Sequence, residues 1–185
     1  LFRKGAQDFA AMSDLPVGLR QRLAERFDLG APTVGAVLRA ADGTEKTMLI
    51  FSDGAAVETV FIPATNRGTA CLSTQVGCRF GCAFCASGAH GFRRNLTAGE
   101  ILDQVVYLRF CRNLPVSNIV CMGMGEPLDN YDALLQAIER LNSADGMGIA
   151  ARRITISTCG LVPGIEQLAS VGLQVNLSVS LHGAR

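Results

Sequence analysis

No apolar run in the sequence approaches the length of a membrane-spanning helix, which is about 18–20 residues. No signal-peptide pattern precedes the first helix-like segment, so we expect no membrane association and a cytoplasmic location. The sequence also carries little net charge, because 17 basic and 16 acidic side chains leave only +1. This balance does not by itself indicate a nucleic-acid binder, although it leaves room for a local basic surface. The chain contains no internal repeat and no low-complexity tract.

The sequence does contain enough apolar residues to build a core. Hydrophobic residues make up 49% and charged residues 18% of the 185 positions, a mixture that excludes an intrinsically disordered chain. This length suits one domain with a small appendage. The chain starts at Leu1 rather than Met and stops at Arg185 directly after a strand-like run, so we expect a piece of a longer protein, truncated at both ends.

The seven cysteines are an odd number and a high density for this length. A secreted disulfide scaffold would be smaller and poorer in core residues, so we expect thiols in a reducing cytoplasm. Cys111, Cys121 and Cys159 are interpreted as small hydrophobes that pack in the core. Three others need a chemical explanation.

The first two regions of the chain predict a small helical segment and an antiparallel β meander. In residues 1–33 apolar residues recur every four positions, with Pro16 in the first helical turn and Ser13 or Asp14 as its cap. In residues 34–66 the period changes to two, and Asp-Gly pairs at residues 42–43 and 53–54 favour hairpin turns. The expected strands are 34–38, 46–51 and 57–62. Residues 63–68 are then interpreted as a linker.

Residues 67–185 predict a parallel α/β core. Four strand-like runs alternate with three helix-like runs, which is typical of βαβ units with right-handed crossovers. The strand-like runs are 69–75, 118–122, 153–157 and 174–181, and the helix-like runs are 97–110, 131–141 and 163–169. Thr97 and Glu100 form a capping box at the start of the first helix.

Unusual residues follow each of the four predicted strands. Three cysteines follow the first strand, a glycine-rich segment at residues 123–127 follows the second, Ser157 ends the third, and residues 180–182 end the fourth. The carboxyl ends of parallel strands meet at one edge of a sheet, and sites form there. The sequence therefore predicts one site at this edge.

Cys78, Cys82 and Cys85 lie within eight residues, so their thiolates could converge on a metal centre. A structural zinc site usually takes four ligands as two separated pairs, and a fourth ligand would have to come from Cys71 or His90. A [4Fe–4S] cluster is normally held by four thiolates, so three would leave one iron open. The amine and carboxylate of S-adenosylmethionine (SAM) could chelate that iron. The cluster explains the count better, and zinc stays open as the alternative.

The loop Cys78-Arg-Phe-Gly-Cys-Ala-Phe-Cys85 resembles the CxxxCxxC signature of the radical SAM superfamily, with Phe84 at its aromatic position. The resemblance implies a partial (βα)6 barrel, of which about four βα units would be present here. It also implies a [4Fe–4S] cluster with three Cys ligands, and SAM as the cofactor. The residues that it implies for SAM binding are Gly125, Glu126, Ser157, Ser180, Leu181, His182 and Gly183. Among them, Glu126 would accept hydrogen bonds from the methionyl amino group. The alternatives that involve no SAM are a tight turn for the glycine-rich segment, a helix cap for Ser157 and a structural role for His182.

Four longer strings resemble the RlmN/Cfr family of RNA adenine methyltransferases, in its adenine-C2 branch most closely. They are residues 69–78, 91–96, 122–130 and 180–182. The helical start and residues 58–63 also fit that family's accessory region and connecting strand. The resemblance therefore covers nearly the whole chain.

The family resemblance implies radical chemistry, because a polar methyl transfer from SAM needs a nucleophilic acceptor. Carbons C2 and C8 of adenine are electrophilic and cannot act as one. One SAM would methylate a cysteine beyond Arg185, and a second would be cleaved at the cluster to a radical that activates this methyl group. Glu58 is implied as the proton acceptor for the adenine carbon, with an ordinary exposed strand residue as the alternative. Cys71 is implied as the thiol that releases the product while a disulfide forms, with a buried strand cysteine as the alternative.

The implied substrates are adenosine C2 in 23S rRNA and in tRNA. Two alternatives stay open: the C8-methylating branch that confers antibiotic resistance, and, from a different class, a zinc-stabilised RNA-binding module. Arg93 and Arg94 are interpreted either as contacts to RNA phosphate or as part of a solvated loop. We also expect a monomer and an external electron donor such as flavodoxin or ferredoxin. The isolated 185 residues should be inactive, because two strands and one essential thiol would be missing.

Overall fold

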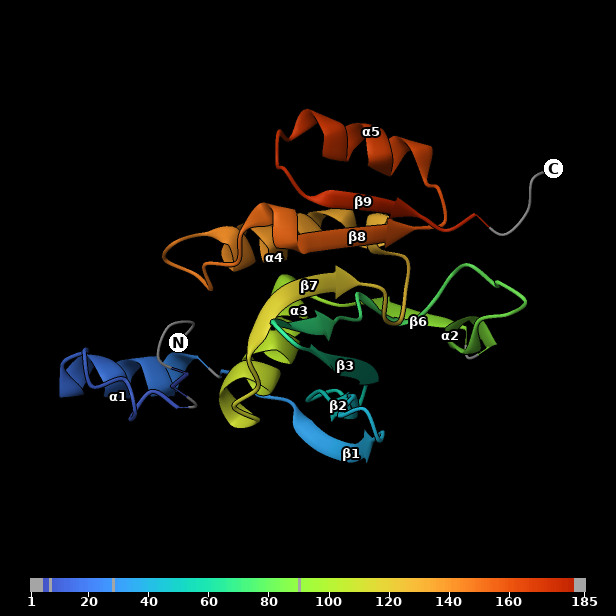
Figure 1. Cartoon of the computed structure of the whole chain (residues 1–185). Helices are drawn as coiled ribbons and strands as arrows, with labels where there is room; N and C mark the ends of the chain where they lie inside the picture. Colours follow the sequence, from blue (N-terminus) through green and yellow to red (C-terminus); the bar gives the residue numbers. More distant parts are fainter. Residues whose placement is uncertain (1–4, 7, 28, 90, 182–185) are drawn as a thin grey trace.

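The computed structural model describes residues 5–6, 8–27, 29–89 and 91–181. It confirms the α/β prediction, with a seven-stranded mixed sheet in the order β1-β2-β3-β4-β7-β8-β9 and a separate pair of β5 and β6 (Figure 1). The strands are β1 Thr33–Arg39, β2 Glu45–Ile50, β3 Ala56–Ala64, β4 Arg67–Cys71, β5 Gln75–Gly77, β6 Phe92–Asn95, β7 Val116–Cys121, β8 Ile154–Thr158 and β9 Asn176–Val179. The helices are α1 Val17–Arg26, α2 Ala86–Ala89, α3 Ala98–Val106, α4 Tyr131–Asn142 and α5 Val162–Ser170.

The predicted meander is confirmed, because β1, β2 and β3 pair antiparallel in chain order. Both hairpins turn at the predicted Asp-Gly pairs, where Gly43 and Gly54 have φ of +84° and +75°. Glycine adopts this left-handed conformation without a steric penalty. The carboxylates of Asp42 and Asp53 each accept a hydrogen bond of 2.9 Å from the backbone N–H two residues further on, which tightens both turns.

The linker predicted at residues 63–68 is wrong, because these residues are part of the sheet. β3 runs to Ala64 and β4 starts at Arg67, and the two strands pair antiparallel with Pro63 opposite Gly68. The Asn-Arg-Gly sequence is typical of a loop, but two residues are enough for a tight hairpin turn. The meander therefore continues without a break into the parallel strands.

The parallel part of the sheet is confirmed, since β4, β7, β8 and β9 are parallel neighbours. β4 is shorter than predicted and ends at Cys71. The chain then leaves the main sheet, and β5 pairs antiparallel with β6, a pairing that the sequence does not predict. As a result the cysteine loop, defined as residues 78–85, follows a strand of the small pair rather than of the main sheet.

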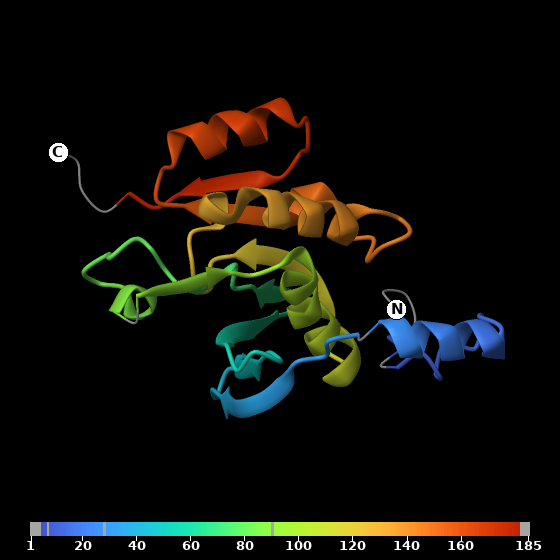
Figure 2. The ribbon, with the colours of Figure 1, turned by 180° about the vertical axis from the view of Figure 1, so that it is seen from behind.

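The helices pack mainly on one face of the sheet. α3 begins at the predicted capping box, where Thr97 and Glu100 each accept a hydrogen bond from the other's backbone N–H. It ends at Val106 and continues as a π-helical turn at Tyr107–Cys111, where the sequence predicts continuous helix. Figure 2 shows α3 and α4 together on this face. Among the described elements, none covers β7, β8 and β9 on the face seen in Figure 1.

The N-terminal helix α1 stands away from the sheet, and none of its residues is buried (Figure 1). It is shorter than predicted, because the described residues before it form bends and turns. Its N-cap is Pro16 and has no side-chain cap hydrogen bond, so the prediction of Ser13 or Asp14 as the cap is wrong. Nowhere in the described ranges does a helix have the length and apolarity needed to cross a membrane.

The hydrophobic core lies between the sheet and the helices. Its largest fully buried side chains include Leu49, Leu72, Leu108, Ile119, Leu134, Ile138, Ile154 and Ile156. The alternation in β8 shows how the sheet is used, because Ile154 and Ile156 are buried while Thr155 and Ser157 are half-buried on the other face. One face therefore packs against helices, and the other offers polar side chains.

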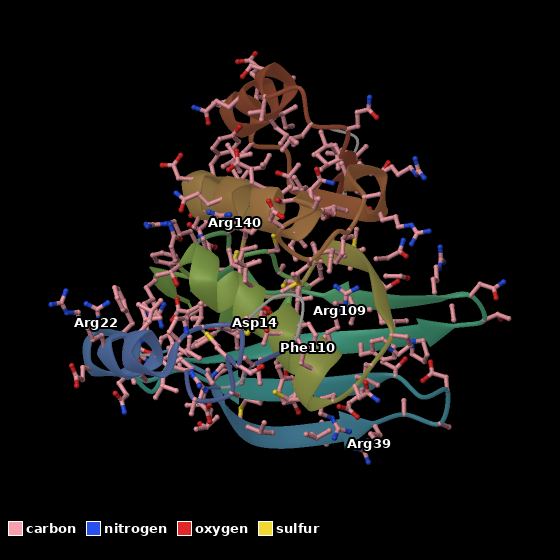
Figure 3. The ribbon with its side chains drawn as sticks, turned by 90° about the vertical axis from the view of Figure 1, so that its left-hand side faces the viewer. Asp14, Arg22, Arg39, Arg109, Phe110 and Arg140 are labelled. Atoms are coloured by element: carbon pink, nitrogen blue, oxygen red, sulfur yellow. The ribbon has the colours of Figure 1, made fainter. Side chains whose placement is uncertain are left out.

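A buried glutamate joins the meander to the turn before β7. The Glu45 carboxylate accepts hydrogen bonds of 2.8 and 2.9 Å from Arg112 and of 2.9 Å from Arg39, and its side chain is 6% exposed. These ion pairs, that to Arg112 first, lower the pKa of Glu45 to about 2 from its usual 4.5. Figure 3 labels Arg39, the member of this cluster that ends β1.

This carboxylate should make the protein sensitive to acid. A pKa lowered in the folded state adds stability above the unfolded value, and that stability is lost as pH falls from about 5 toward 2. We expect Glu45→Gln to cost about 1–2 kcal/mol at pH 7, after allowing for solvent screening, and to cost little at pH 2. Urea unfolding of both proteins at a series of pH values measures this difference. Glu139→Gln, on the exposed side of α4, is the control and should leave the profile of the wild type unchanged.

Candidate functional site

A cavity of about 280 Å³ lies at the carboxyl edge of the parallel strands. It brings together most of the side chains that the sequence predicts for one site, from four separate segments of the chain. The predicted residues that line it are Cys78, Cys82, Cys85, Gly125, Glu126, Ser157 and Ser180. The topology explains this convergence, because β7, β8 and β9 all end at this edge and the cysteine loop lies beside it (Figure 1).

The three predicted cysteine ligands share this cavity. Burial raises the pKa of the Cys78 thiol, and the Cys82 and Cys85 thiols, which line the same cavity, add to the rise. In the described part of the chain, no group of three His, Cys, Asp or Glu side chains is arranged to hold a metal ion. A zinc ion needs its ligands to converge on one atom at about 2.3 Å, whereas the thiolates of a [4Fe–4S] cluster bind separate irons. His90, one possible zinc ligand, lies outside the described residues.

Glu126 is buried in the wall of the cavity and held by two backbone groups. Its carboxylate accepts hydrogen bonds of 3.1 Å from the N–H of Leu128 and of 2.8 Å from the N–H of Cys159. The first bond caps the short 3₁₀ helix Pro127–Asn130, and the second ties the end of β8 to the end of β7. Each carboxylate oxygen can accept a further hydrogen bond, so a ligand amine in the cavity could also be bound.

The prediction that Cys159 packs in the core is wrong, and so is that for Cys111, because both cysteines are exposed. Cys159 lines the cavity instead, since Gly160, with φ of +107°, turns the chain directly after β8. Burial of the sulfur and a hydrogen bond to Glu126 raise the pKa of Cys159 to about 12, so this thiol stays protonated. The packing prediction holds for Cys121, which is 1% exposed.

The strand-end residues on β8 and β9 meet across the open face of the sheet. The hydroxyls of Ser157 and Ser180 lie 3.3 Å apart, and both side chains line the cavity. Leu181 follows at 78% exposure and does not line it. The predicted site residues His182 and Gly183 lie outside the described residues.

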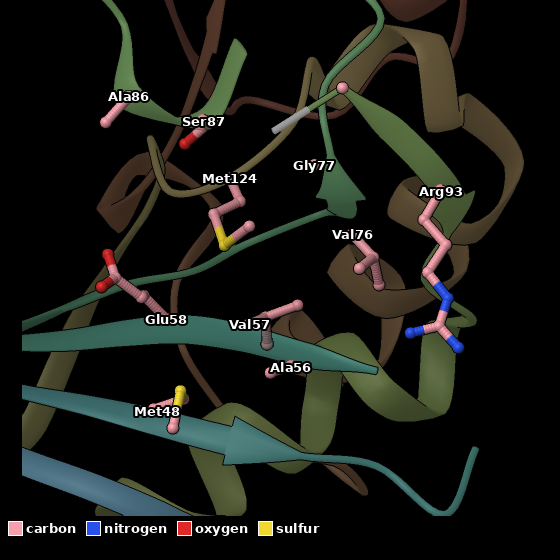
Figure 4. A pocket seen from close by; sticks show the side chains of 11 residues that line it. Met48, Ala56, Val57, Glu58, Val76, Gly77, Ala86, Ser87, Arg93 and Met124 are labelled. Atoms are coloured by element: carbon pink, nitrogen blue, oxygen red, sulfur yellow. The ribbon is translucent and has the colours of Figure 1, made fainter. Parts of the chain in front are cut away.

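Glu58 lines a second cavity, of about 430 Å³, beside the first. Figure 4 shows its carboxylate on one side, the Arg93 side chain on the other, and Met48, Val57 and Met124 around the space between them. The glycine-rich segment separates the two cavities, because Met124 lines this one and its neighbours Gly123 and Gly125 line the other.

A lysine holds the Glu58 carboxylate at the mouth of the second cavity. The Nζ of Lys46 lies 2.8 Å from its Oε1, and both side chains are close to half exposed. Because β3 runs antiparallel to β4, Glu58 lies near the same edge as the end of β4, and its carbonyl accepts a 2.6 Å hydrogen bond from Ser73.

Cys71 ends β4 opposite Val60, on the face of the sheet that also carries Glu58. It is half-buried and lines neither cavity. Burial raises the pKa of the Cys71 thiol, partly offset by a hydrogen bond to the backbone of Met122. The predicted disulfide is not supported, because none of the seven cysteines, all in the described ranges, is in a disulfide.

The two arginines suggested as RNA contacts differ in their surroundings. Arg94 makes hydrogen bonds of 2.7 and 2.9 Å to Glu100 and of 2.8 Å to Asp53, so it joins β6, α3 and the β2–β3 turn. These contacts, those to Glu100 first, raise the pKa of Arg94. Arg94 is therefore part of an ion-pair network rather than of a solvated loop, whereas Arg93 makes one contact of 3.3 Å to the carbonyl of Asp53 and lines the Glu58 cavity.

Sequence reasoning missed the buried amides that support the site. Gln75 and Gln104 are 0% exposed, and Asn130 is 6% exposed. Gln104 bonds both backbone groups of Ser73 at 2.9 Å, and Asn130 donates to the carbonyls of Thr74 and Leu96. One signal was present, because Gln104 occupies a position on the apolar face of α3, between the buried Ile101 and Leu108.

Three comparisons with known proteins identify the family of the chain. Residues 72–185 match the family model of the radical SAM superfamily. The chain is also similar to a solved structure, that of a radical SAM methyltransferase from Sphaerobacter thermophilus, with 47% identity and a TM-score of 0.91 over 98% of this chain and 54% of that one. These matches favour a radical SAM protein over a zinc-stabilised RNA-binding module.

Curated relatives cover the whole chain. A protein of Akkermansia muciniphila named "Probable dual-specificity RNA methyltransferase RlmN" is 47% identical over 100% of this chain and 54% of its own length. The "Dual-specificity RNA methyltransferase RlmN" of Halorhodospira halophila is 47% identical over 98% of this chain and 51% of its own length. The chain therefore spans about half the length of the curated relatives it matches.

Proposed function

The chain belongs to the radical SAM superfamily, which uses an iron–sulfur cluster and SAM, and from this premise we propose that the protein is an RNA methyltransferase of the RlmN type. Its proposed reaction is the methylation of adenosine at C2 in 23S rRNA and in tRNA. The names of relatives at 47% identity, which include RNA methylation and dual specificity, support the substrate class.

One observation carries the proposal: a single cavity collects three cysteines, a glycine-rich turn with a buried carboxylate, and two strand-end hydroxyls. The thiolates of Cys78, Cys82 and Cys85 would hold a [4Fe–4S] cluster and leave one iron open. When bound, such a cluster supplies the electron that cleaves SAM reductively. Phe84, which belongs to the loop, is 64% exposed and lines the same cavity.

The other wall of the cavity suits the methionyl end of SAM. Glu126 would accept hydrogen bonds from the amino group, because its two oxygens keep lone pairs beyond those used by Leu128 and Cys159. The hydroxyls of Ser157 and Ser180 would bind the ribose or the carboxylate. The Cys159 thiol competes for Glu126, so the amine would have to displace this hydrogen bond.

The second cavity suits the reacting base. Its apolar walls, Met48, Val57 and Met124, offer surfaces for a flat ring, and Glu58 would accept the proton lost from the adenine carbon. Lys46 keeps the Glu58 carboxylate oriented before the base enters. Cys71 would serve as the thiol that releases the product, and its raised pKa means that it needs a base to become a nucleophile.

The proposal includes three further features that follow from the chemistry. The electron must come from outside, from a donor such as flavodoxin or ferredoxin. An unstacked adenine is the required form of the RNA substrate, because the reacting carbon is inaccessible inside a helix. We also propose a monomer that acts in the cytoplasm.

Nucleoside mass spectrometry tests the proposed function. The complete gene is expressed in a host that lacks its own adenine C2 methyltransferase, and rRNA and tRNA are digested separately. We expect 2-methyladenosine in both pools. Glu58→Gln should lower the product at least a hundredfold while the cluster stays bound, because a proton acceptor typically contributes 10²–10⁴-fold.

The other outcomes are equally informative. 8-Methyladenosine would move the protein to the resistance branch, and product in rRNA alone would remove the tRNA activity. The absence of both products, from a protein that holds iron and sulfide, would contradict the proposed function. Val60→Thr, a change on the same strand that alters no proposed catalytic group, is the matched control for Glu58→Gln.

A further inference from the structure

We propose that Gln75 is a positioning residue that holds the glycine-rich turn in the shape that binds the methionyl end of SAM. Gln75 opens β5, three residues before the first cluster cysteine, and its side chain is fully buried. It therefore joins the two walls of the cavity, the cysteine loop and the segment 123–126. This inference rests on the proposed function in one respect, that SAM binds in this cavity.

The amide of Gln75 uses both of its ends. Its Oε1 accepts a 2.9 Å hydrogen bond from the backbone N–H of Glu126. Its Nε2 donates to Asn95 at 2.8 Å and to the Asp129 carboxylate at 2.7 Å, which uses both protons. The opposite orientation would place the NH₂ group against the Glu126 N–H and the oxygen against a carboxylate, so only one orientation is stable. The peptide before Glu126 is thereby fixed by a side chain that cannot rotate.

The stem of the same side chain sets the position of Gly125. This glycine has φ of +99°, and a Cβ built on it would lie 2.5 Å from the Gln75 Cβ and 2.7 Å from the Cγ. The turn thus rests directly on Gln75, and only glycine fits there. The backbone adds to this contact, because the N–H groups of Thr74 and Gln75 both point to the Met124 carbonyl, at 2.9 and 3.2 Å.

An ion pair continues the network to the cysteine loop. The Asp129 oxygen that accepts from Gln75 also lies 3.0 Å from the Nε of Arg79, the residue after Cys78. The Arg79 guanidinium is stacked on Phe92 of β6 at 3.8 Å from the ring centroid. A change at Gln75 should therefore reach the methionyl site through Glu126 and the cysteine loop through Asp129.

The test compares two ligands on the full-length protein with its cluster bound, under anaerobic conditions. SAM carries the methionyl amine and carboxylate, whereas 5′-methylthioadenosine lacks both. Gln75→Met removes the three hydrogen bonds and keeps most of the volume. We expect it to weaken SAM binding about tenfold or more, the loss that follows from one or two hydrogen bonds, and to leave the affinity for 5′-methylthioadenosine within about twofold of the wild type. Equilibrium dialysis measures both dissociation constants.

Asn142→Leu is the control. Asn142 ends α4 and is half-buried, and its side-chain amide donates a 2.9 Å hydrogen bond to the carbonyl of Ile149, away from both cavities. The substitution should lower the unfolding midpoint without the selective loss of SAM affinity. Gln75→Leu, which removes the same three hydrogen bonds with a smaller apolar side chain, gives a second variant with the same expected selectivity if Gln75→Met does not fold.

The outcomes separate this inference from the proposed function. Equal weakening of both ligands, or no weakening of SAM binding, would reduce Gln75 to a structural residue and overturn the inference. A wild-type protein that holds its cluster but binds no SAM would instead count against the proposed function.

Discussion

Replacing Cys82 with Ala should remove the iron–sulfur cluster. If Cys78, Cys82 and Cys85 hold the cluster in the full-length protein as proposed, the loss of one leaves two thiolates for a group that is normally held by four. Iron and acid-labile sulfide should fall to background, the visible absorption of the cluster should disappear, and no methylated adenosine should form. The fold should survive, because the turn at this position is made by backbone hydrogen bonds, from the N–H of Cys82 to Phe80 and from that of Cys85 to Cys82.

The control for this substitution is Cys111→Ala. Cys111 is exposed at the end of the π-helical turn, before β7 begins, and so lies at the opposite end of the parallel strands from the cavity. Its replacement should leave iron content and activity unchanged. A Cys82→Ala protein with a full iron load would show that the ligand assignment is wrong, whatever its activity.

Replacing Gly77 with Ala should have an effect of comparable size, although Gly77 carries no functional group. Its φ is +75°, and an added Cβ would overlap the carbonyl oxygen of Gly91, the residue directly before β6, which pairs with β5. The same carbonyl accepts the 3.1 Å hydrogen bond from the N–H of Cys78. The pair β5–β6 would have to separate directly before Cys78, the first of the proposed cluster ligands, at a cost of about 3 kcal/mol or more. The thermal unfolding midpoint and the iron content of the variant should both be lower than those of the wild type.

Two other glycines divide this effect into its parts. Gly81→Ala lies in the same loop with open space around it and an ordinary φ, and should change stability by less than about 0.5 kcal/mol. Gly91 also has open space around an added Cβ, but its φ is +68°. Gly91→Ala should therefore lower the stability by about 1 kcal/mol through backbone strain alone, without steric overlap. Equal stabilities for all three variants would mean that the β5–β6 pair does not hold the cysteine loop.

Much of the fold could be predicted from the sequence, because several local sequence signals determine the structure by themselves. The Asp-Gly turns, the capping box at Thr97 and the alternation of strands with helices each have a direct physical cause. The failures lie where tertiary contacts decide. Loop-like residues at the end of β3 became a two-residue hairpin, and the run 69–75 became two strands in two sheets, since the buried amides fix the bend between them.

The site was predictable to the extent that its groups follow strand ends. The rule placed the three cysteines, Glu126, Ser157 and Ser180 at one edge, and one cavity holds them all. It could not place Cys159, which no spacing distinguishes from a packing residue, nor Gln75, whose role depends on contacts with Asn95 and Asp129, 20 and 54 residues away. Arg94 was open to interpretation as an RNA contact or as part of a solvated loop, because its partner Asp53 is 41 residues away in the sequence.

β4 has only five residues, yet it is antiparallel to β3 on one side and parallel to β7 on the other. Both halves of the sheet therefore depend on the same short strand for a hydrogen-bonded neighbour. If either half opened alone, it would leave β4 with an unpaired row of N–H and C=O groups in what had been the interior of the sheet. The meander and the parallel strands should for this reason unfold cooperatively, in one event, and a stabilising change in one half should also protect the other.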